Sequence, residues 1–585
     1  MRRRVAVSSA LSLVLGLLAS GTVSAAQADG SCPDGVTLTD ISAIQGAGAA
    51  SPLAGSLLTT EGVVVGDFQP AELQSGFFLQ DEQGDGNPAT SEGLFVFVPQ
   101  GNPLSSIDVR PGDRVRVSGT VKEFRTGSGT LTELDTVTAL SVCSSGAALA
   151  PTSVALPVSA VTDLEAYEGM LVTFSQALTV TDTFNLGRFG ELVLSSGGRI
   201  FNPTNGQGGT PEENVLRRIL LDDGSTRQNP SSIPFLSEPG VEGTRRVGDS
   251  VSGLTGVLTF NFSEYRIHPT VAPVFSNSNP RTAAPAPIAG GVKVASFNVL
   301  NYFTTLGARG ADTPEEFLRQ KAKTVAALKA LDADIVGLIE LENNGTTAIL
   351  DLVDALNVAY GQAVYAAVPD PVSGTGSDEI KVAFIYKPGT VSLVGESLSS
   401  PDPIFDRFPV AQTFRENSGY GGDFTVVINH FKSKGSCPPS GDVEQGQGCW
   451  NLKRIAQAQK LLEFIGELQG SSNDPDVLVI GDLNAHAEED PVDTLREGGL
   501  DHLSLRIPAA QRYSFVFDGQ SGELDHALAT PSLAAQVRDI TVWHINSDEP
   551  PVLDYNTEFK TDDRFAPTPF RSSDHDPVII GLDLE

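Results

Sequence analysis

The chain carries few cationic side chains for its length. Its 585 residues include 39 Lys and Arg against 72 Asp and Glu, which gives a formal net charge of −33. Because a nucleic-acid-binding protein normally presents a basic face, this balance argues against an ordinary binder of that kind. It does not exclude an anionic substrate, since metal ions and a few local cations can reverse the sign of the field at one site.

Long apolar segments are also scarce. The one candidate lies at the N-terminus, where arginines at positions 2–4 precede about a dozen apolar residues and small residues that end at Ala26 or Ala28. This is the pattern of an export signal, and the run is too short to span a bilayer. We predict a signal peptide over residues 1–28 and a secreted protein, extracellular or periplasmic, with no membrane partner.

Cysteine is rare as well, with four residues in the whole chain. An even number of cysteines in an exported protein is typical of disulfides. Cys437 and Cys449 lie close together in a Gly/Pro-rich loop, so we predict a local disulfide between them. Cys32 and Cys143 then pair by elimination, although four cysteines allow three connectivities.

The sequence divides into a β-rich part and a mixed part. Five short apolar or alternating runs between residues 55 and 143 suit a small barrel, which we assign to residues 29–148. A second β-rich domain is predicted over residues 149–275. A Pro/Ala/Gly linker at 276–291 ends it, and residues 292–585 form the last predicted domain.

This last domain alternates strands with helices and therefore predicts an α/β fold. Helical periodicity runs from Thr313, a plausible N-cap followed by Pro314 in the first turn, to Leu331. A second helix is expected from about Asn451 to Leu468.

Polar side chains stand repeatedly where an apolar strand of this domain begins or ends. One such residue means little, because Asp and Asn commonly begin turns. Six strands with this feature predict that their ends converge on one cleft, and the residues are Asn298, Glu340, His430, Asp482, Asn484, Asp525, Asp574 and His575. Oxygen ligands without cysteine suit Mg²⁺, Mn²⁺ or Ca²⁺ better than zinc.

Seven short motifs occur here in the order found in the DNase I-like endonuclease/exonuclease/phosphatase superfamily. They are SFNVLN, DIVGLIELEN, RFPV, INHFKSKG, GDLNA, LDHAL and SSDHDPV, and residues 292–585 resemble that superfamily throughout. NHFKSKGSC, GQGCWN and WHINSDEP are similar to blocks of its large secreted bacterial endonucleases, and SGFFLQDEQGDGNPATSEGLFVF resembles the OB-like domain that precedes the nuclease in them. The resemblance implies a four-layer α/β sandwich with the site at one edge.

The resemblance also implies residue roles. Glu340 and Asn298 would bind the catalytic Mg²⁺ or Mn²⁺, and Asp574 would complete that site. Asp525 would orient His575. Asp576, the other neighbour of this histidine, is expected to be solvated or to cap a strand.

The remaining roles concern the phosphate. Asp482 would position the attacking water and Asn484 would contact the phosphate, while His430 would bind the phosphate or assist the leaving oxygen. Cationic contacts to the substrate are expected from Arg407 and Lys432. The acidic partner of His430 is either Asp378 or Glu379, and the sequence does not choose between them.

These residues together predict a secreted, metal-dependent endonuclease that cleaves DNA, with RNA as a further candidate substrate. A cation and hydrogen-bond donors must neutralise the phosphodiester before a nucleophile can approach it. The alternative within enzymes is a phosphomonoesterase or a lipid phosphodiesterase, because one catalytic core can serve several substrates. A binding module without catalysis is the alternative outside enzymes. Nothing in the sequence indicates oligomerisation, so a monomer is expected.

Two further patterns remain. The loop DEQGDGNPATSE, residues 81–92, follows the spacing of an EF-hand loop, with Asp81, Asp85 and Glu92 as candidate ligands of a structural Ca²⁺. The competing interpretation is a hairpin turn, because the flanking runs are strands. Among the other histidines, His486 and His502 are expected to be turn or structural residues. His526 should face away from Asp525 if that segment is extended.

Overall fold

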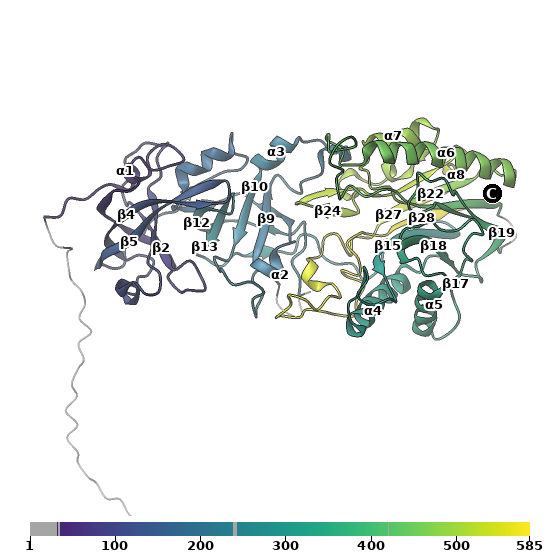
Figure 1. The fold of residues 1–585 in the computed structure, drawn as a ribbon, viewed down its shortest axis with the longest axis horizontal. Coiled ribbons are helices and arrows are strands. Elements are labelled where there is room, and N and C mark those ends of the chain that lie inside the picture. The colour runs from purple at the N-terminus through teal and green to yellow at the C-terminus, as the bar shows by residue number, and fades with distance from the viewer. Residues whose placement is uncertain (1–31, 33–34, 238–242, 419–420, 585) are drawn as a thin grey trace, which may run out of the picture.

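The computed structural model describes residues 32, 35–237, 243–418 and 421–584, so the predicted signal peptide lies outside the described residues. The molecule is elongated, with a barrel at one end, a second β region in the middle and an α/β region at the other end (Figure 1). Among the described residues, no helix has the length and apolar character needed to cross a bilayer.

The first region is a closed five-stranded barrel in the order β1-β2-β3-β5-β4. Alternating apolar residues such as Val115 and Val117 fill its interior. The strands are β1 (Leu57–Phe68), β2 (Gly76–Gln80), β3 (Gly93–Phe97), β4 (Arg114–Thr126) and β5 (Gly129–Ser144), and helix α1 (Ile41–Gln45) lies beside them. The small barrel predicted from the spacing of the runs is therefore present.

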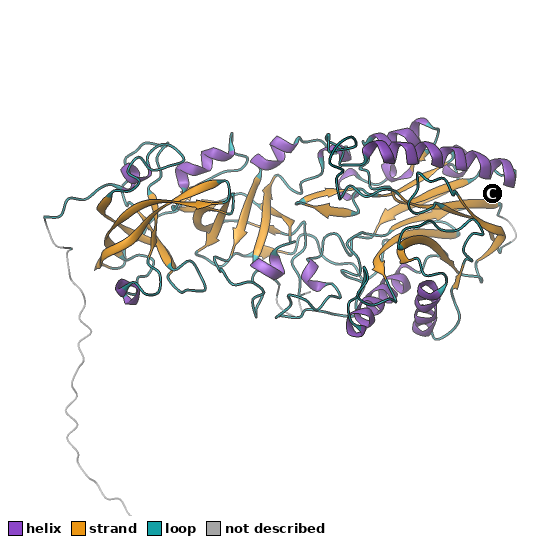
Figure 2. Cartoon of the chain, in the orientation of Figure 1, coloured by secondary structure: helices purple, strands orange, loops and turns teal. Residues whose placement is uncertain are grey.

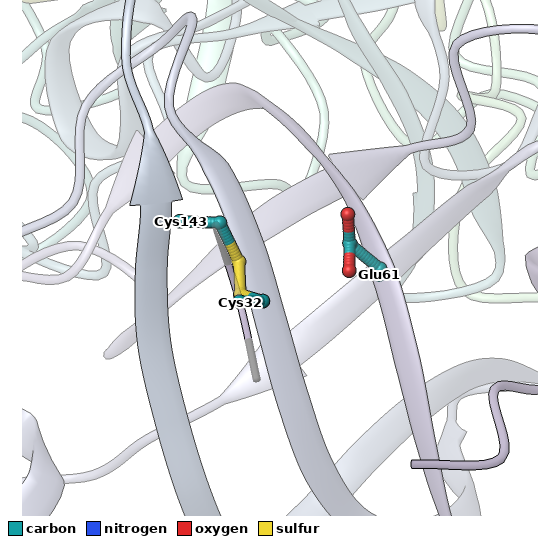
Figure 3. A group of neighbouring side chains, drawn as sticks. All are labelled: Cys32, Glu61 and Cys143. Atoms are coloured by element: carbon teal, nitrogen blue, oxygen red, sulfur yellow. A yellow bond between two sulfur atoms is a disulfide. The ribbon is translucent and has the colours of Figure 1, made fainter. Parts of the chain in front are cut away.

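A disulfide ties the start of the described chain to the end of β5. Cys32 and Cys143 are bonded, with their Cα atoms 4.9 Å apart (Figure 3). Glu61 lies close to them, but it forms an ion pair with Arg116 at 2.7 Å and the bonded sulfurs offer no thiolate to a metal. The second predicted disulfide, Cys437–Cys449, is also present, so both pairings are confirmed.

The middle region is a nine-stranded sheet in the order β14-β11-β8-β9-β10-β13-β12-β7-β6. Its strands are β6 (Thr152–Ser153), β7 (Leu171–Phe174), β8 (Leu178–Asp182), β9 (Glu191–Ser196), β10 (Arg218–Asp222), β11 (Ser250–Val251), β12 (Leu254–Asn261), β13 (Glu264–Pro269) and β14 (Phe275–Ser276). The short helices are α2 (Leu186–Phe189) and α3 (Pro211–Leu216).

Two six-stranded mixed sheets form the last region. The first, in the order β17-β18-β16-β15-β28-β27, consists of β15 (Val292–Tyr302), β16 (Ile335–Glu342), β17 (Ala366–Ala367), β18 (Ile380–Tyr386), β27 (Val537–Val542) and β28 (Val578–Leu582). The second, in the order β19-β20-β21-β22-β26-β23, consists of β19 (Val391–Ser399), β20 (Val410–Glu416), β21 (Asp423–His430), β22 (Val477–Asp482), β23 (Asp501–His502) and β26 (Asp525–Ala529). A separate hairpin joins β24 (Phe515–Phe517) to β25 (Gln520–Gly522).

Side-chain alternation along these strands produces four layers. Along β22, Leu478 and Ile480 enter the core between the sheets, whereas Val477 and Val479 enter the core beneath a helix. Helices cover both outer faces (Figures 1 and 2), and they are α4 (Pro314–Leu331), α5 (Thr347–Tyr360), α6 (Asn451–Ser472) and α7 (Asp490–Glu497). The short helix α8 (Pro531–Ala534) instead adds Leu533 and Ala534 to the core between the sheets. The predicted four-layer sandwich is confirmed.

The helix boundaries follow local signals. Thr313 caps α4, because its hydroxyl accepts from the Glu316 amide at 3.2 Å while the Glu316 carboxylate accepts from the Thr313 amide at 3.1 Å. Helix α6 begins at the predicted Asn451 but runs past Leu468 to Ser472.

Buried ion pairs join the middle region to the sandwich. Arg199 contacts Asp548 at 2.8 Å, and Arg246 lies against both Asp548 and Glu549. The main chain adds to this junction, since Ser521 donates to the Ile200 carbonyl at 2.9 Å. The middle region therefore has a fixed position beside the edge of the sandwich.

Candidate active site

The strand-end residues meet at one edge of the sandwich, as predicted. In the second sheet, His430 is paired in register with Asp482, and Asp482 with Asp525. Each of the three shares its strand face with residues of the core between the sheets, such as Ile428, Ile480 and Ala527. Strand alternation thus directs all three polar side chains toward the first sheet.

His575 is held by Asp525 across a long sequence separation. Its Nδ1 lies 2.7 Å from Asp525 Oδ2, and its Nε2 lies 4.0 Å from Asp482 Oδ2. The Ser514 hydroxyl donates to the same Asp525 oxygen at 2.7 Å, which fixes the carboxylate. Burial alone would lower the pKa of His575, but the charges of Asp525 and Asp482 outweigh it and raise that pKa well above its usual value. The ring is therefore held as a cation.

Asp482 and His430 form a second contact at this edge. Their closest atoms, Oδ2 and Nε2, are 3.5 Å apart. Burial, with the charge of Asp525 adding to it, raises the pKa of Asp482 to about 7 even though the His575 charge opposes the shift. Burial and the neighbouring Arg407 charge lower the pKa of His430 well below its usual value. The site thus joins a neutral imidazole to a carboxyl group poised near neutral pH.

Neither candidate acidic partner contacts His430 among the described residues. Asp378 pairs with Arg309 at 2.9 Å and with Arg407 at 3.3 Å, and Glu379 lies 3.5 Å from Arg309. His430 Nδ1 is buried without a hydrogen-bond partner in the described structure. Among the described residues, the carboxylate that lies within ion-pair distance of His430 is that of Asp482, whose Oδ2 is 3.5 Å from Nε2.

Glu340 and Asn298 are placed by irregular backbone. The register of β16 shifts between Leu338 and Leu341, and Glu340 has a left-handed φ of 64°. The register of β15 shifts directly after Asn298. Bulges of this kind redirect side chains beside active sites, and strained backbone is concentrated there.

This pair fits a divalent ion. Burial raises the pKa of Glu340 and the charge of Asp574 raises it further, whereas the adjacent Asn298 side chain lowers it. A cation would remove this repulsion, and Asn298 would contribute its Oδ1, which accepts from the Leu300 amide at 3.0 Å, because an amide nitrogen is a donor. Among the described residues, Glu340 does not share a cluster with two further His, Cys or carboxylate side chains whose ligand atoms all lie within 4.8 Å of one another. One or two carboxylates, completed by waters and substrate phosphate, is the usual coordination of Mg²⁺.

Arg407 is buried, at 6% exposure, rather than presented to solvent. Its guanidinium donates to the carbonyl of His430 at 3.2 Å and to that of Phe431, and its third contact is Asp378. These bonds make it a support for the end of β21. The predicted contact with the substrate backbone stays a prediction, as does that of Lys432, whose ammonium lies 5.4 Å from the centre of the Trp450 ring.

Asn484 occupies a strained turn after β22. It has a left-handed φ of 48°, and its main-chain amide donates to Asp482 Oδ1 at 2.8 Å. Its side-chain Nδ2 donates to the Phe431 carbonyl at 3.1 Å. The turn therefore orients the Asp482 carboxylate and brings Asn484 to the cleft wall.

A cleft of about 620 Å³ opens at this edge. His575 and Asn484 line it together with Lys434 and the hairpin residues Phe515 and Phe517. The loop closed by the second disulfide forms part of the wall, and so do Asn202, Pro203, Thr204 and Pro211 of the middle region. Sequence reasoning missed this second contribution, because nothing local in residues 202–211 indicates where that segment packs.

The burial of Asp576 differs from the sequence prediction. This residue is 1% exposed, and its Oδ1 accepts from the amides of Asn546 at 2.8 Å and Ser547 at 3.1 Å. Its Oδ2 lies 3.0 Å from His544 Nδ1. The prediction of a solvated residue was wrong, because the partners that bury it are about thirty positions away in the sequence and only the fold brings them near.

The loop at 81–92 has internal hydrogen bonds. Asp85 Oδ1 accepts from the Asn87 amide at 2.6 Å, and Glu92 Oε1 accepts from the Asp85 amide at 2.8 Å. The carboxylate oxygens of Asp81, Asp85 and Glu92 do not all lie within 4.8 Å of one another. A calcium ion here stays a prediction.

Two segments of the chain match known family models. Residues 295–575 match the model of the Endonuclease/Exonuclease/phosphatase family, and residues 145–279 match a model described as a domain of unknown function, DUF8508. No curated protein matches the chain.

Among solved structures, the chain is similar to the human nocturnin catalytic domain with bound sulfate, at 18% identity and a TM-score of 0.33, covering 51% of this chain and 97% of that one. It is also similar to a mannosyl-6-phosphatase of Bacteroides thetaiotaomicron, at 18% identity and a TM-score of 0.32, covering 50% and 99%. A third is D. rerio TDP2 complexed with single strand DNA product, at 16% identity and a TM-score of 0.32, covering 49% and 97%.

The sandwich, the site at its edge and the family match agree. Members of this family are hydrolases that act on phosphoester bonds. Residues 295–575, just under half of this chain, are thus similar to the endonuclease/exonuclease/phosphatase family in sequence.

Proposed function

We propose that this protein is a secreted endonuclease that hydrolyses phosphodiester bonds of DNA with the help of Mg²⁺ or Mn²⁺. The observation that carries the proposal is the contact of His575 with Asp525 at 2.7 Å beside Asp482, at the edge where Glu340 and Asn298 also lie. This set joins a cationic donor, a carboxylate of raised pKa and a pair of oxygen ligands, which phosphodiester hydrolysis requires together.

The residues divide the chemistry between them. Asp482, whose pKa is about 7, accepts a proton from the attacking water at neutral pH. The His575 cation donates a hydrogen bond to the phosphate as negative charge develops there, and Asp525 keeps the ring in position. His430 and Asn484 bind the remaining oxygens or the leaving group. Glu340, Asn298 and Asp574 would hold the divalent ion, which supplies charge neutralisation to the phosphate when bound.

The cleft favours a polymer over a small phosphomonoester. It is about 620 Å³ and is walled by two regions of the chain, so it extends beyond what one phosphate group needs. Phe517 on its wall is 74% exposed, and an exposed aromatic ring offers a stacking surface to a nucleobase. Lys434, on the same wall, pairs with Glu489 at 2.5 Å, so this ion pair adds no net positive charge to the cleft.

The five-stranded barrel supports the further proposal of an OB-like domain, an architecture that binds oligonucleotides in other proteins. Export fits the two disulfides, which form and persist in oxidising compartments.

The test compares supercoiled plasmid with a chromogenic phosphomonoester and a phospholipid, each with Mg²⁺, Mn²⁺ or a chelator. We expect nicking of the plasmid that the chelator abolishes, with the other two substrates hydrolysed far more slowly. A gel containing DNA or RNA then decides the sugar specificity. Faster release from the phosphomonoester than from DNA would overturn the proposal in favour of a phosphatase.

A further inference from the structure

Three buried side chains of the sandwich converge outside the catalytic cleft. His502, at the end of β23, and His526, on β26, approach Glu523, which precedes β26. Their exposures are 7%, 1% and 2%, and none of them lines the cleft. The mechanism proposed above uses none of the three.

The contact atoms form a nearly equilateral triangle. His502 Nε2 lies 3.1 Å from His526 Nδ1, and both nitrogens lie 3.4 Å from Glu523 Oε1. In a tetrahedral zinc site with bonds of about 2.0 to 2.2 Å, neighbouring ligand atoms are separated by about 3.3 to 3.5 Å. The two edges of 3.4 Å match this spacing, and the edge of 3.1 Å is about 0.2 Å shorter.

The tautomer of His526 is fixed by its second nitrogen. Nε2 lies 2.7 Å from the Ala485 carbonyl, and because a carbonyl only accepts, Nε2 carries the proton. In the neutral ring, Nδ1 then directs a lone pair into the triangle. A metal-bound histidine almost always donates its other N–H to a carbonyl or carboxylate in this way.

Hydrogen bonds alone leave this cluster poorly satisfied. His526 Nδ1 and Glu523 Oε1 are both acceptors, and they face each other across 3.4 Å with one His502 proton at most between them. Glu523 Oε2 is also buried without a hydrogen-bond partner in the described structure, although the nearby Ser504 hydroxyl helps to lower the pKa of this carboxyl group. Converging buried acceptors are costly unless a proton or a cation lies between them.

We propose that His502, Glu523 and His526 bind a structural zinc ion, with water or the Ser504 hydroxyl as the fourth ligand. Two imidazoles and one carboxylate are a ligand set that zinc accepts. The ion would join β23 to β26 directly behind Asp525, and through the Ala485 contact it would hold the turn that carries Asn484. The site is independent of the proposed substrate.

The first test measures zinc binding by the full-length exported protein. Protein stripped with a strong chelator is titrated with Zn²⁺ against a chromophoric chelator. We expect one tightly bound equivalent in the wild type and an affinity at least about a hundredfold lower in His526→Gln and in His502→Gln. His268→Gln is the matched control, because His268 is a buried histidine of the middle region beside Asp222, 3.6 Å away.

The catalytic metal must be distinguished from this ion. Glu340→Gln should leave the zinc equivalent unchanged, because Glu340 lies in the other cluster. Absence of zinc uptake by the wild type, or uptake that His526→Gln and His502→Gln do not change, would overturn the proposal.

A second measurement needs no variant and so does not depend on how well the variants fold. Co²⁺ added to the stripped wild type should give the intense visible absorption of tetrahedral cobalt, and Zn²⁺ should remove it. The melting temperature should rise with the Zn²⁺ concentration, since an ion that binds only the folded state stabilises it. A weak, octahedral cobalt spectrum with no thermal shift would contradict the proposed site.

Discussion

Strand β26 presents a histidine–carboxylate group on each of its faces. On the inner face, Asp525 holds His575 at 2.7 Å, and His575 lines the cleft. On the outer face, His526 meets His502 at 3.1 Å and Glu523 at 3.4 Å, and none of them reaches the cleft. The residue types are the same, but only the inner group can meet a substrate.

The hydrogen bonding of the two groups also differs. The inner pair joins a ring nitrogen to Asp525 Oδ2, which Ser514 also binds, so a charged histidine satisfies that oxygen, whereas Asp525 Oδ1 is buried without a hydrogen-bond partner in the described structure. The outer group brings together several acceptors with too few protons. A histidine beside a carboxylate therefore indicates proton transfer to a substrate only when a cleft reaches it.

Removal of the inner histidine should have the largest effect. We expect His575→Ala to lower turnover of plasmid DNA about a hundredfold or more, because a positioned acid–base group typically contributes that much. Asp525→Asn should reproduce part of this loss, since it favours the wrong tautomer of His575. Initial rates are measured on variants whose circular dichroism matches the wild type.

The control for this loss is His268→Gln. It removes a buried histidine of the middle region that does not line the cleft. It should keep near-normal turnover. Comparable activity of His575→Ala and the wild type would refute the assignment of the inner face.

How much of this contrast the sequence reveals depends on distance along the chain. His430 and Asp482 were predicted because each ends its own strand, where alternation decides the face on which it lies. Asn298 and Glu340 were predicted from the same pattern, but they lie inside β15 and β16 at register shifts that the sequence does not reveal. The prediction from alternation that His526 faces away from Asp525 is confirmed: it contacts Ala485 on the outer side.

The outer cluster was missed. His502 and His526 belong to separate strands, and each has an ordinary local explanation as a structural residue. Asp576 and the cleft residues Asn202 and Thr204 were missed because their partners lie far away in the sequence. Local patterns predict strand faces, whereas packing between distant segments decides which faces meet.

The two disulfides allow a second contrast, with a smaller expected effect. Cys437 and Cys449 close a loop on the cleft wall, and we expect their joint replacement by serine to lower the free energy of unfolding by about 2 to 3 kcal/mol. Because the freed loop lines the cleft, KM should rise more than kcat falls. Replacement of Cys32 and Cys143 in the barrel should destabilise the protein without that change in KM. Equal effects of the two pairs on KM would contradict the role of the loop.

The pH dependence of cleavage should report Asp482. Its pKa is raised to about 7, and a base acts only when deprotonated, so kcat/KM should fall about tenfold for each pH unit below that value. A bound cation stabilises the carboxylate, so the apparent pKa should decrease as Mg²⁺ increases. The rate is measured from pH 5 to about pH 9 at several Mg²⁺ concentrations. A flat profile across neutral pH would exclude Asp482 as the base.

The smallest effect is expected at the loop of residues 81–92. Its carboxylates already accept hydrogen bonds from main-chain amides. Asp85 Oδ1 accepts from the Asn87 amide at 2.6 Å, and Glu92 Oε1 accepts from the Asp85 amide at 2.8 Å. We therefore expect a hairpin whose melting temperature in the full-length protein is the same in chelator and in millimolar Ca²⁺. Burial raises the pKa of Glu92, and the charges of Asp85 and Asp81 add to the shift, so a bound cation would still relieve a real repulsion. A rise in melting temperature with Ca²⁺ that the Asp85→Ala/Glu92→Ala variant loses would replace the hairpin by the calcium site.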